Sequence, residues 1–236
     1  MPGTPVTSGM EIFLDSANVK EIQRWLDEGI VDGVTTNPSI MLADGVHDVE
    51  RGAVQIAELV HPRPVSVEVT TNDRDEMLRQ GRALARLGPN IVVKIPVINQ
   101  FGEPCLRIVR ALEGEGIRVN VTACLSFGQA AMAAKVGATY VSLFTGRISD
   151  EGNDAGAVVR MTAEWLARWG YKSRIIVGSI RQVYNIQEAA VAGAHVITVP
   201  PQFMQKLVDH KYSRDTVRGF VEDGQRALSK MGAART

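Results

Sequence analysis

Short segments rich in valine and isoleucine alternate with amphipathic segments from residue 11 almost to the end of the chain. The short segments have the length and β-branched content of buried strands, and the longer ones have the apolar spacing of helices that cover one face of a sheet. We expect strands at residues 11–15, 32–36, 64–69, 91–95, 118–122, 139–144, 174–178 and 195–199. We expect helices at residues 18–28, 48–60, 73–87, 103–115, 126–136, 153–169, 182–192 and 213–230.

This alternation restricts the fold to parallel strands joined by helices, which form either a closed barrel or an open doubly wound sheet. A doubly wound sheet usually has fewer strands, and a nucleotide-binding one carries a glycine fingerprint or a Walker motif, neither of which occurs in the sequence. The eight units therefore predict an α/β fold, a single-domain (β/α)₈ TIM barrel with an extra C-terminal helix. We expect a disordered leader at residues 1–9 and one catalytic domain over residues 10–236.

Charge and composition limit the partners. The 26 basic and 26 acidic side chains give no net charge, which argues against binding to nucleic acid or to a membrane surface. Cys105 and Cys124 lack the spacing of a zinc site, and the four histidines are scattered, so neither a metal nor a cofactor is predicted. No signal peptide or apolar run of membrane-spanning length is present in the sequence, and we expect a cytoplasmic location.

Lys94 lies inside the apolar run at residues 91–96, where a charged ammonium is costly to bury. Burial disfavours the charged form of a lysine, and the neutral amine can attack a carbonyl carbon to form a Schiff base. The alternative is structural, because Lys94 could extend to the strand end or pair with a carboxylate. The segment alone leaves both interpretations open.

Polar side chains gather at the ends of the predicted strands, which is where a TIM barrel builds its active site. They are Asp15, Thr35, Asn37, Glu68, Lys94, Asn120, Thr122, Ser142, Arg147, Ser179 and Arg181, with Phe144 beside them. Each of the small polar residues could by itself be a helix cap or a turn residue. Their convergence with a lysine in an apolar strand nevertheless predicts a site for carbonyl chemistry.

Several segments, in order, resemble transaldolases and the related fructose-6-phosphate aldolases. They are Phe13–Ala17 (FLDSA), Gly33–Ser39 (GVTTNPS), Val92–Pro96 (VVKIP), Asn120–Thr122 (NVT) with Leu125–Ala130 (LSFGQA), Gly146–Ile148 (GRI) and Gly178–Arg181 (GSIR). The resemblance covers essentially everything after the leader, and the compact length is similar to the short-chain branch. Short-chain relatives form ring-like homo-oligomers, often decamers, so the resemblance also implies a homo-oligomer.

The resemblance implies transfer of a dihydroxyacetone unit from a ketose phosphate, sedoheptulose 7-phosphate or fructose 6-phosphate, to an aldose phosphate. Lys94 would form the Schiff base, Asp15 would take and return the proton, and Glu68 with Thr122 would hold a water, although Glu68 could also be a counter-charge for Lys94. Thr35, Asn37, Asn120 and Ser142 would bind hydroxyls of the retained fragment. Arg147 and Arg181 offer planar charged forks, and Ser179 adds a hydroxyl, so these three are predicted to bind the phosphate.

Two positions bear on the choice between transferase and aldolase. The family's transferase members carry Glu and Phe where its aldolase members carry Gln and Tyr, and this chain has Glu68 and Phe144. We therefore favour a transaldolase. An aldolase that releases dihydroxyacetone and a non-catalytic sugar-phosphate-binding barrel remain the alternatives. The segment at residues 97–104 departs from the family pattern and borders the predicted site, which leaves the exact donor and acceptor sugars open.

Overall fold

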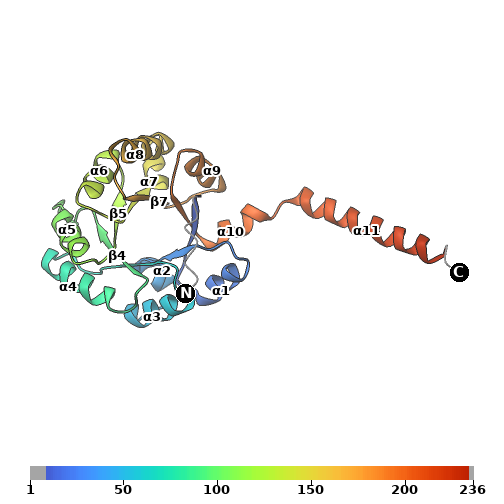
Figure 1. Cartoon of the computed structure of the whole chain (residues 1–236), viewed down its shortest axis with the longest axis horizontal. Helices are drawn as coiled ribbons and strands as arrows, with labels where there is room; N and C mark the ends of the chain where they lie inside the picture. The colour runs from blue at the N-terminus through green and yellow to red at the C-terminus, as the bar shows by residue number, and fades with distance from the viewer. Residues whose placement is uncertain (1–8, 234–236) are drawn as a thin grey trace. The chain divides into compact units, whose positions relative to one another are not determined.

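A computed structural model describes residues 9–233 of the chain, so the predicted leader lies outside the described residues except for Gly9. Within the described part, eight parallel strands close into one barrel in sequence order, and β1 pairs with β8 to complete the ring (Figure 1). The strands are β1 (Glu11–Asp15), β2 (Gly33–Thr35), β3 (Val65–Glu68), β4 (Ile91–Pro96), β5 (Val119–Cys124), β6 (Tyr140–Phe144), β7 (Arg174–Gly178) and β8 (Val196–Val199). The predicted TIM barrel is confirmed, and the ends of every predicted strand fall within two residues of the observed ones.

The described residues also form eleven helices, most of which lie around the outside of the strand ring (Figure 1). They are α1 (Val19–Asp27), α2 (Pro38–Ala43), α3 (Val49–Val60), α4 (Arg74–Ala85), α5 (Leu106–Gly114), α6 (Phe127–Lys135), α7 (Thr145–Asp150), α8 (Ala155–Trp169), α9 (Val183–Val191), α10 (Pro201–Val208) and α11 (Lys211–Ala233). The sequence analysis missed the short helices α2, α7 and α10. Each is a turn or two long, too short to show helical periodicity, and residues 37–39 also have the composition of a turn.

Helix α2 has a clear physical start despite its length. The Asn37 side chain accepts a hydrogen bond from the backbone N–H of Ile40 at 2.9 Å, and Pro38 occupies the first helical turn, where a missing N–H costs nothing. The Asn-Pro-Ser sequence therefore ends the short connection after β2 and also begins and caps helix α2. This places Asn37, a predicted site residue, directly at the C-terminal end of β2.

The chain divides into two compact units, Met1–Pro201 and Gln202–Thr236. The first unit contains the whole barrel. In the second unit, α11 confirms the predicted helix at 213–230 and extends it at both ends, with ion pairs such as Lys211 to Asp215 at 3.1 Å along its surface. Among the described residues, no helix is long and apolar enough to cross a membrane.

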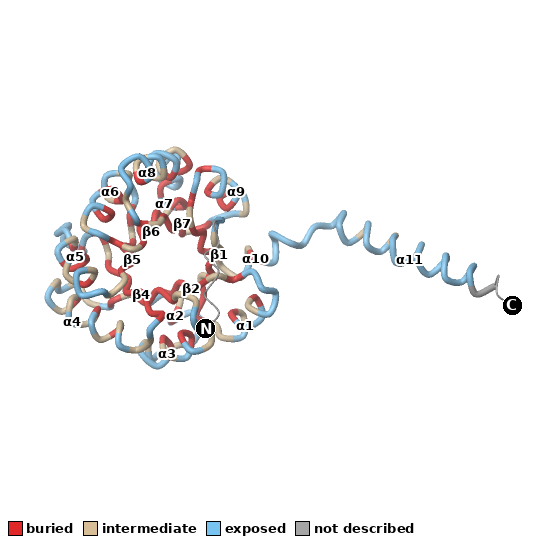
Figure 2. The backbone as a smooth tube through the Cα atoms, viewed as in Figure 1, coloured by how far each residue is buried: buried red, intermediate tan, exposed pale blue. Residues whose placement is uncertain are grey.

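The interior of the barrel is apolar below the level of the site. One buried cluster draws side chains from five strands: Phe13, Val92, Tyr140, Ile176 and Val196. The Phe13 ring fills the space beside Gly33, where an added Cβ would lie 2.7 Å from the ring. Figure 2 shows the buried strands and the buried inner faces of the surrounding helices. Burial of each apolar side chain of this kind stabilises the folded state by about 1.5–3 kcal/mol. This apolar layer therefore supports the polar residues that line the cavity above it.

One carboxylate ties α5 to the starts of two neighbouring strands. Oε1 of Glu113 accepts hydrogen bonds from the backbone N–H of Val119 at 2.8 Å, from the N–H of Thr139 at 2.7 Å and from the Thr139 hydroxyl at 2.8 Å. Thr139 directly precedes β6, and Val119 opens β5. Glu113 therefore fixes both strands at their starts, one residue before Asn120 in β5 and three residues before Ser142 in β6.

Candidate active site

The ends of the strands surround a cavity of about 160 Å³. It is lined by Asp15, Thr35, Asn37, Lys94, Asn120, Ser142, Phe144, Arg147, Gly178, Ser179, Arg181 and Thr198. Of the predicted site residues, ten line this cavity, and Glu68 and Thr122 do not. The structure thus brings together residues from β1, β2, β4, β5, β6, β7 and β8, from the segment after β7 and from α7.

Lys94 points into this cavity from the middle of β4, with only 6% of its side chain exposed. Its Nζ lies 3.2 Å from Oε2 of Glu68 and donates a hydrogen bond to the carbonyl of Thr36 at 2.8 Å. Glu68 and Lys94 are paired neighbours in the β3–β4 register, so the strand pairing itself brings the two side chains together. Glu68 is therefore a counter-charge for Lys94, which the sequence analysis had left as the alternative to its water-holding role, and the amine still lines the cavity.

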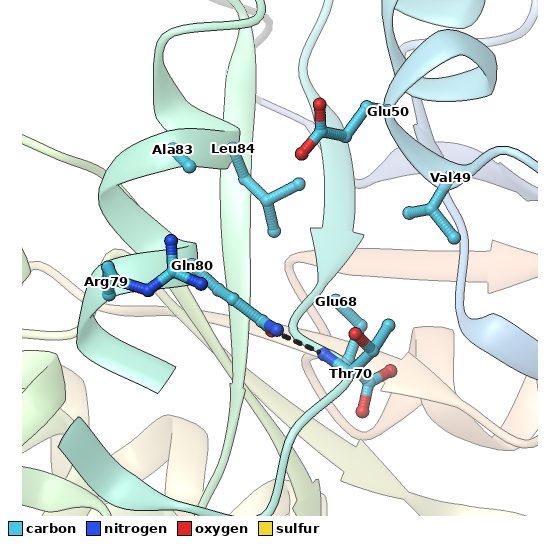
Figure 3. Close-up of a pocket in the computed structure, with 8 residues that line it drawn as sticks. All are labelled: Val49, Glu50, Glu68, Thr70, Arg79, Gln80, Ala83 and Leu84. Atoms are coloured by element: carbon cyan, nitrogen blue, oxygen red, sulfur yellow. Dashed lines mark hydrogen bonds between the residues drawn. The ribbon is translucent and has the colours of Figure 1, made fainter. Parts of the chain in front are cut away.

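Glu68 also borders a second pocket, of about 190 Å³, on the flank of the barrel between α3 and α4 (Figure 3). In that pocket the Gln80 side chain from α4 accepts a hydrogen bond from the backbone N–H of Thr70 at 2.9 Å. Glu68 thus contacts the Lys94 amine and also borders a pocket of mixed polar and apolar lining outside the main cavity.

Asp15 ends β1 and carries a carboxyl group with a perturbed proton affinity. Burial raises the pKa of Asp15 above its usual range, while the hydrogen bond from Thr35 at 2.6 Å and the nearby Lys94 oppose the rise. The negative charges of Asp44 and Glu68 add to it. A carboxyl in this setting is suited to exchange a proton with a bound molecule, because a raised pKa makes its ionised form a stronger base than an exposed aspartate.

Asp44, at the end of α2, holds the chain that follows Asp15. Its Oδ2 accepts hydrogen bonds from the Ser16 hydroxyl at 3.0 Å and from the backbone N–H of Ala17 at 2.7 Å. The Ser16 hydroxyl in turn accepts from the N–H of Asn18 at 3.0 Å. The turn between β1 and α1 is thus fixed by one exposed carboxylate from the neighbouring βα unit.

A chain of buried hydrogen bonds joins β3, β5 and β6 across the cavity floor. Ser142 donates to Oδ1 of Asn120 at 2.7 Å, and the Asn120 amide donates to the hydroxyl of Ser66 at 3.2 Å. These bonds fix the orientation of the Asn120 amide in the cavity wall. Nearby, Thr122 is buried, and its hydroxyl has no hydrogen-bond partner among the described residues.

Two arginines lie on the exposed rim of the cavity. Arg147 belongs to α7, and its guanidinium carbon is 5.9 Å from the centre of the Phe144 ring. Arg181 follows β7 and forms an exposed ion pair with Asp150 at 3.1 Å. Ser179 lies between the β7 end and Arg181 with φ of 60°, a left-handed conformation that turns the backbone sharply at this point. The rim is therefore the most positively charged part of the cavity lining.

The segment at residues 97–104 forms a short braced hairpin. Ile98 and Pro104 form an isolated antiparallel bridge, and the buried Asn99 side chain accepts from the N–H groups of Phe101 and Glu103 while it donates to the Glu103 carboxylate at 2.7 Å. The prediction that a helix begins at residue 103 was wrong. Glu103 and Pro104 complete this hairpin, and α5 begins only at Leu106.

The sequence analysis missed four residues that shape the site. Thr198 lines the cavity, Ser66 supports Asn120, Asp44 holds the turn after Asp15, and Gly146 allows α7 to approach the β7 end. Thr198 could have been found, because it lies in the last predicted strand, whose end follows the same rule as the other seven. Gly146 lies in a segment that resembles the family, but its role, like those of Ser66 and Asp44, depends on contacts between distant segments that the sequence does not show.

The class of protein follows from this arrangement: a TIM-barrel enzyme whose cavity at the C-terminal strand ends holds a buried lysine, a carboxyl group and a rim of arginines. Comparison with known proteins identifies the family. Residues 12–235 match the family described as transaldolase/fructose-6-phosphate aldolase, and the chain belongs to it.

Similar proteins agree with this assignment. The chain is 41% identical to a probable transaldolase 2 of Listeria monocytogenes, over 94% of this chain and 100% of the relative. It is 39% identical to a probable transaldolase of Clostridium perfringens, again over 94% of this chain and 100% of the relative.

Solved structures with a similar fold are far more distant in sequence. A mandelate oxidase variant has a TM-score of 0.56 at 15% identity and covers 91% of this chain and 70% of its own. A thiamine phosphate pyrophosphorylase from Pyrococcus furiosus has a TM-score of 0.54 at 13% identity, over 81% of this chain and 85% of its own. They share the barrel fold alone. Among the described residues, no group of three or more His, Cys, Asp or Glu side chains is placed to hold a metal ion.

Proposed function

We propose that this protein is a transaldolase, which moves a dihydroxyacetone unit from a ketose phosphate to an aldose phosphate through a Schiff base on Lys94. The donor is sedoheptulose 7-phosphate or fructose 6-phosphate. The observation that carries the proposal is the Lys94 side chain, almost fully buried yet directed into a polar cavity that it shares with Asp15. A buried amine is a nucleophile for a ketone, and the family assignment gives that chemistry a substrate class.

The reaction begins with attack of the neutral Lys94 amine on the ketone carbon of the donor. A carbon–nitrogen bond forms, the carbonyl oxygen leaves as water after protonation, and an iminium ion remains. Glu68 is 3.2 Å from the amine and can accept the ammonium proton, then return it to the departing oxygen. The Thr122 hydroxyl, which has no hydrogen-bond partner among the described residues, and the pocket beside Glu68 support a water that carries protons in this step.

Carbon–carbon cleavage then requires a base. Asp15 removes the proton from the hydroxyl on the far carbon of the bond that breaks, this oxygen becomes the aldehyde oxygen, and the electrons of the broken bond move into the iminium to give an enamine. The aldose phosphate leaves as an aldehyde. The raised pKa of Asp15 supports this role, because it makes the carboxylate a stronger base that can take the proton and later return it.

The second half reverses the first with a different aldose phosphate. The enamine carbon attacks the acceptor aldehyde, Asp15 gives its proton to the new hydroxyl, and water hydrolyses the iminium to free Lys94. Throughout, Asn120 and Ser142 hold hydroxyls of the three-carbon fragment, and Thr35 and Asn37 contact it from the other side of the cavity. Phe144 keeps one face of the cavity apolar.

The phosphate of donor and acceptor binds at the rim. Arg147 and Arg181 supply two guanidinium groups, and the Ser179 hydroxyl lies between β7 and Arg181. Arg181 would exchange its exposed ion pair with Asp150 for a charge-assisted bond to the phosphate, at little net cost because an exposed pair is weak. The distance between rim and lysine then selects sugars that carry the phosphate at the end remote from the ketone.

Glu68 and Phe144 favour the transferase over the aldolase, and the curated relatives are named probable transaldolases. The alternative is a fructose-6-phosphate aldolase that releases dihydroxyacetone without an acceptor. We further propose that the enzyme acts in pentose phosphate metabolism as a cytoplasmic homo-oligomer, a state that light scattering of the purified chain would test.

The test is product analysis after incubation with fructose 6-phosphate, with and without erythrose 4-phosphate, beside Lys94→Met. Sedoheptulose 7-phosphate that forms only with the acceptor, together with a covalent mass increase on wild type but not on Lys94→Met after borohydride reduction, is the expected result. Free dihydroxyacetone without acceptor would assign the aldolase. Absence of both turnover and label would refute the Schiff-base proposal.

A further inference from the structure

Thr198 is buried in the cavity wall at the end of β8, next to β1 in the closed barrel. Its hydroxyl oxygen lies 2.5 Å from that of Thr35, and the Thr35 hydroxyl donates to Oδ1 of Asp15 at 2.6 Å. The three groups therefore form a continuous hydrogen-bonded chain from Thr198 through Thr35 to the carboxyl that serves as the base.

The direction of this chain follows from counting protons. A threonine hydroxyl has one hydrogen to donate, and Thr35 gives that hydrogen to Asp15. The contact between the two hydroxyls must then be filled by the hydrogen of Thr198, which donates to the oxygen of Thr35. Each bond polarises the next, so the Thr198 hydroxyl strengthens the bond that Thr35 makes to the ionised carboxylate.

We propose that Thr198 is a positioning residue for Asp15, acting through Thr35, and that its hydroxyl rather than its methyl group carries this role. The inference rests on the proposed function in assigning Asp15 as the base. Asp15 needs such support because burial works against its ionised form. A charge taken out of water is tolerated when hydrogen bonds to it are themselves fixed and polarised.

Other charged groups act on Asp15 as well. Lys94 favours its ionised form, whereas Asp44 and Glu68 oppose it. The chain of two hydroxyls differs from these because it acts through one defined oxygen and also fixes the orientation of the carboxyl. Removing the Thr198 hydroxyl should therefore disfavour ionised Asp15 and loosen its orientation, while Lys94 keeps its contacts to Glu68 and Thr36.

The methyl group of Thr198 makes a packing contact that does not involve the hydroxyl. The two groups can therefore be removed separately and their effects compared. Its Cγ2 packs against the backbone of β7 at Gly178, where an added Cβ would lie 3.3 Å from it. Thr198→Val keeps this packing and removes the hydroxyl. Thr198→Ser keeps the hydroxyl and removes the methyl group. A packing role and a hydrogen-bonding role thus predict opposite orders for the two variants.

The experiment measures kcat and KM for the donor, each as a function of pH, for wild type, Thr198→Val and Thr198→Ser. We expect Thr198→Val to lower kcat about tenfold, the size of one lost hydrogen bond to a polarised group, with KM changed less than about twofold. Its acid limb should move to higher pH, because the ionised base forms less readily. Thr198→Ser should stay within about twofold of wild type. Thr162→Val is the matched control, because Thr162 is also buried and its hydroxyl donates to the Val158 carbonyl within its own helix α8, away from the cavity.

A Thr198→Ser variant as slow as Thr198→Val, or a Thr198→Val variant with an unmoved acid limb or a change in KM alone, would overturn the proposal. A second readout does not depend on turnover: carbon NMR of Asp15 in protein labelled at the aspartate carboxyls, without substrate. The titration midpoint of the Asp15 carboxyl should be higher in Thr198→Val than in wild type. Equal midpoints would refute the proposal that the Thr198 hydroxyl supports ionised Asp15 through Thr35. If the wild type shows no transfer activity, the proposed function fails, and the NMR titration still decides the role of Thr198.

Discussion

Gly146 offers the sharpest test of how the rim of the cavity is built. An ideal Cβ on Gly146 would lie 1.9 Å from the carbonyl oxygen of Ser179 and 2.8 Å from Cγ of Arg181, whereas ordinary contact begins at about 3.4 Å. The difference between 3.4 and 1.9 Å means that Gly146→Ala must push α7 and the β7 end apart by about 1.5 Å. Backbone resists such a shift more than a flexible side chain does.

Two magnitudes follow from this displacement. Overpacking of a buried contact costs about 1–3 kcal/mol, which lowers the melting temperature of a chain of this size by roughly 2–12 °C. A displacement of about 1 Å in a group that positions substrate costs on the order of a hundredfold in rate. Because Ser179 and Arg181 are displaced but Lys94 is not, we expect kcat/KM for phosphorylated donors to fall about a hundredfold. Borohydride trapping of phosphate-free dihydroxyacetone should stay near the wild-type level.

Gly128→Ala is the matched control, since it is the same substitution in a helix where nothing lies nearer to the added Cβ than the Ser126 hydroxyl at 3.9 Å. Gly128 is exposed near the start of α6, and alanine there should stabilise the helix by up to about 1 kcal/mol. The assays are steady-state kinetics, trapping followed by mass spectrometry, and thermal unfolding. A Gly146→Ala enzyme whose kcat/KM for fructose 6-phosphate stays within about twofold of the wild-type value would refute this reasoning. The close contact between α7 and the end of β7 would then not position the phosphate-binding rim.

Two further changes test the surroundings of the site. In Asp44→Asn the amide oxygen can still accept from Ala17, but the negative charge that helps to raise the pKa of Asp15 is gone. The pKa of Asp15 should therefore fall, and the acid limb of the kcat/KM profile should move to lower pH. A limb that moves upward or does not move would contradict the assignment of Asp15 as the base. Glu113→Ala removes three hydrogen bonds to one carboxylate oxygen and should lower the free energy of unfolding in urea by more than about 2 kcal/mol. The control is Glu115→Ala, which loses an exposed ion pair and should leave the unfolding midpoint nearly unchanged. Equal effects of the two substitutions would argue against a stabilising role for the hydrogen bonds of Glu113.

The barrel was predictable because its signals are local and repeated. Each strand is a short β-branched run, each long helix has an apolar stripe, and glycines such as Gly137 and Gly170 adopt positive φ where helices end. The short helices were not predictable in this way. Their starts depend on single contacts, such as the Asn37 cap of α2, rather than on a period that the sequence displays.

The candidate site was predictable in part for a different reason. Strand-end residues can be found from the fold rule alone, and ten of the predicted residues line one cavity. The contacts that support these residues cannot be found from the sequence, because they join distant segments. Asp44 contacts Ala17 over a separation of 27 residues, and Thr198 contacts Thr35 over a separation of 163 residues. Nothing in the local sequence of either residue indicates its partner.

Register explains why separate strand-end residues become a working site. Asp15 pairs with Thr35 across β1 and β2, Glu68 pairs with Lys94 across β3 and β4, and Lys94 pairs with Asn120 across β4 and β5. Residues paired in a parallel register point to the same side of the sheet at the same height, so these three partnerships follow directly from the strand pairing. A slip of one residue in any pair would turn one partner out of the barrel. The apolar cluster beneath the site and the Glu113 hydrogen bonds at the starts of β5 and β6, which fix that register, are therefore as necessary to the proposed chemistry as the side chains that meet the sugar.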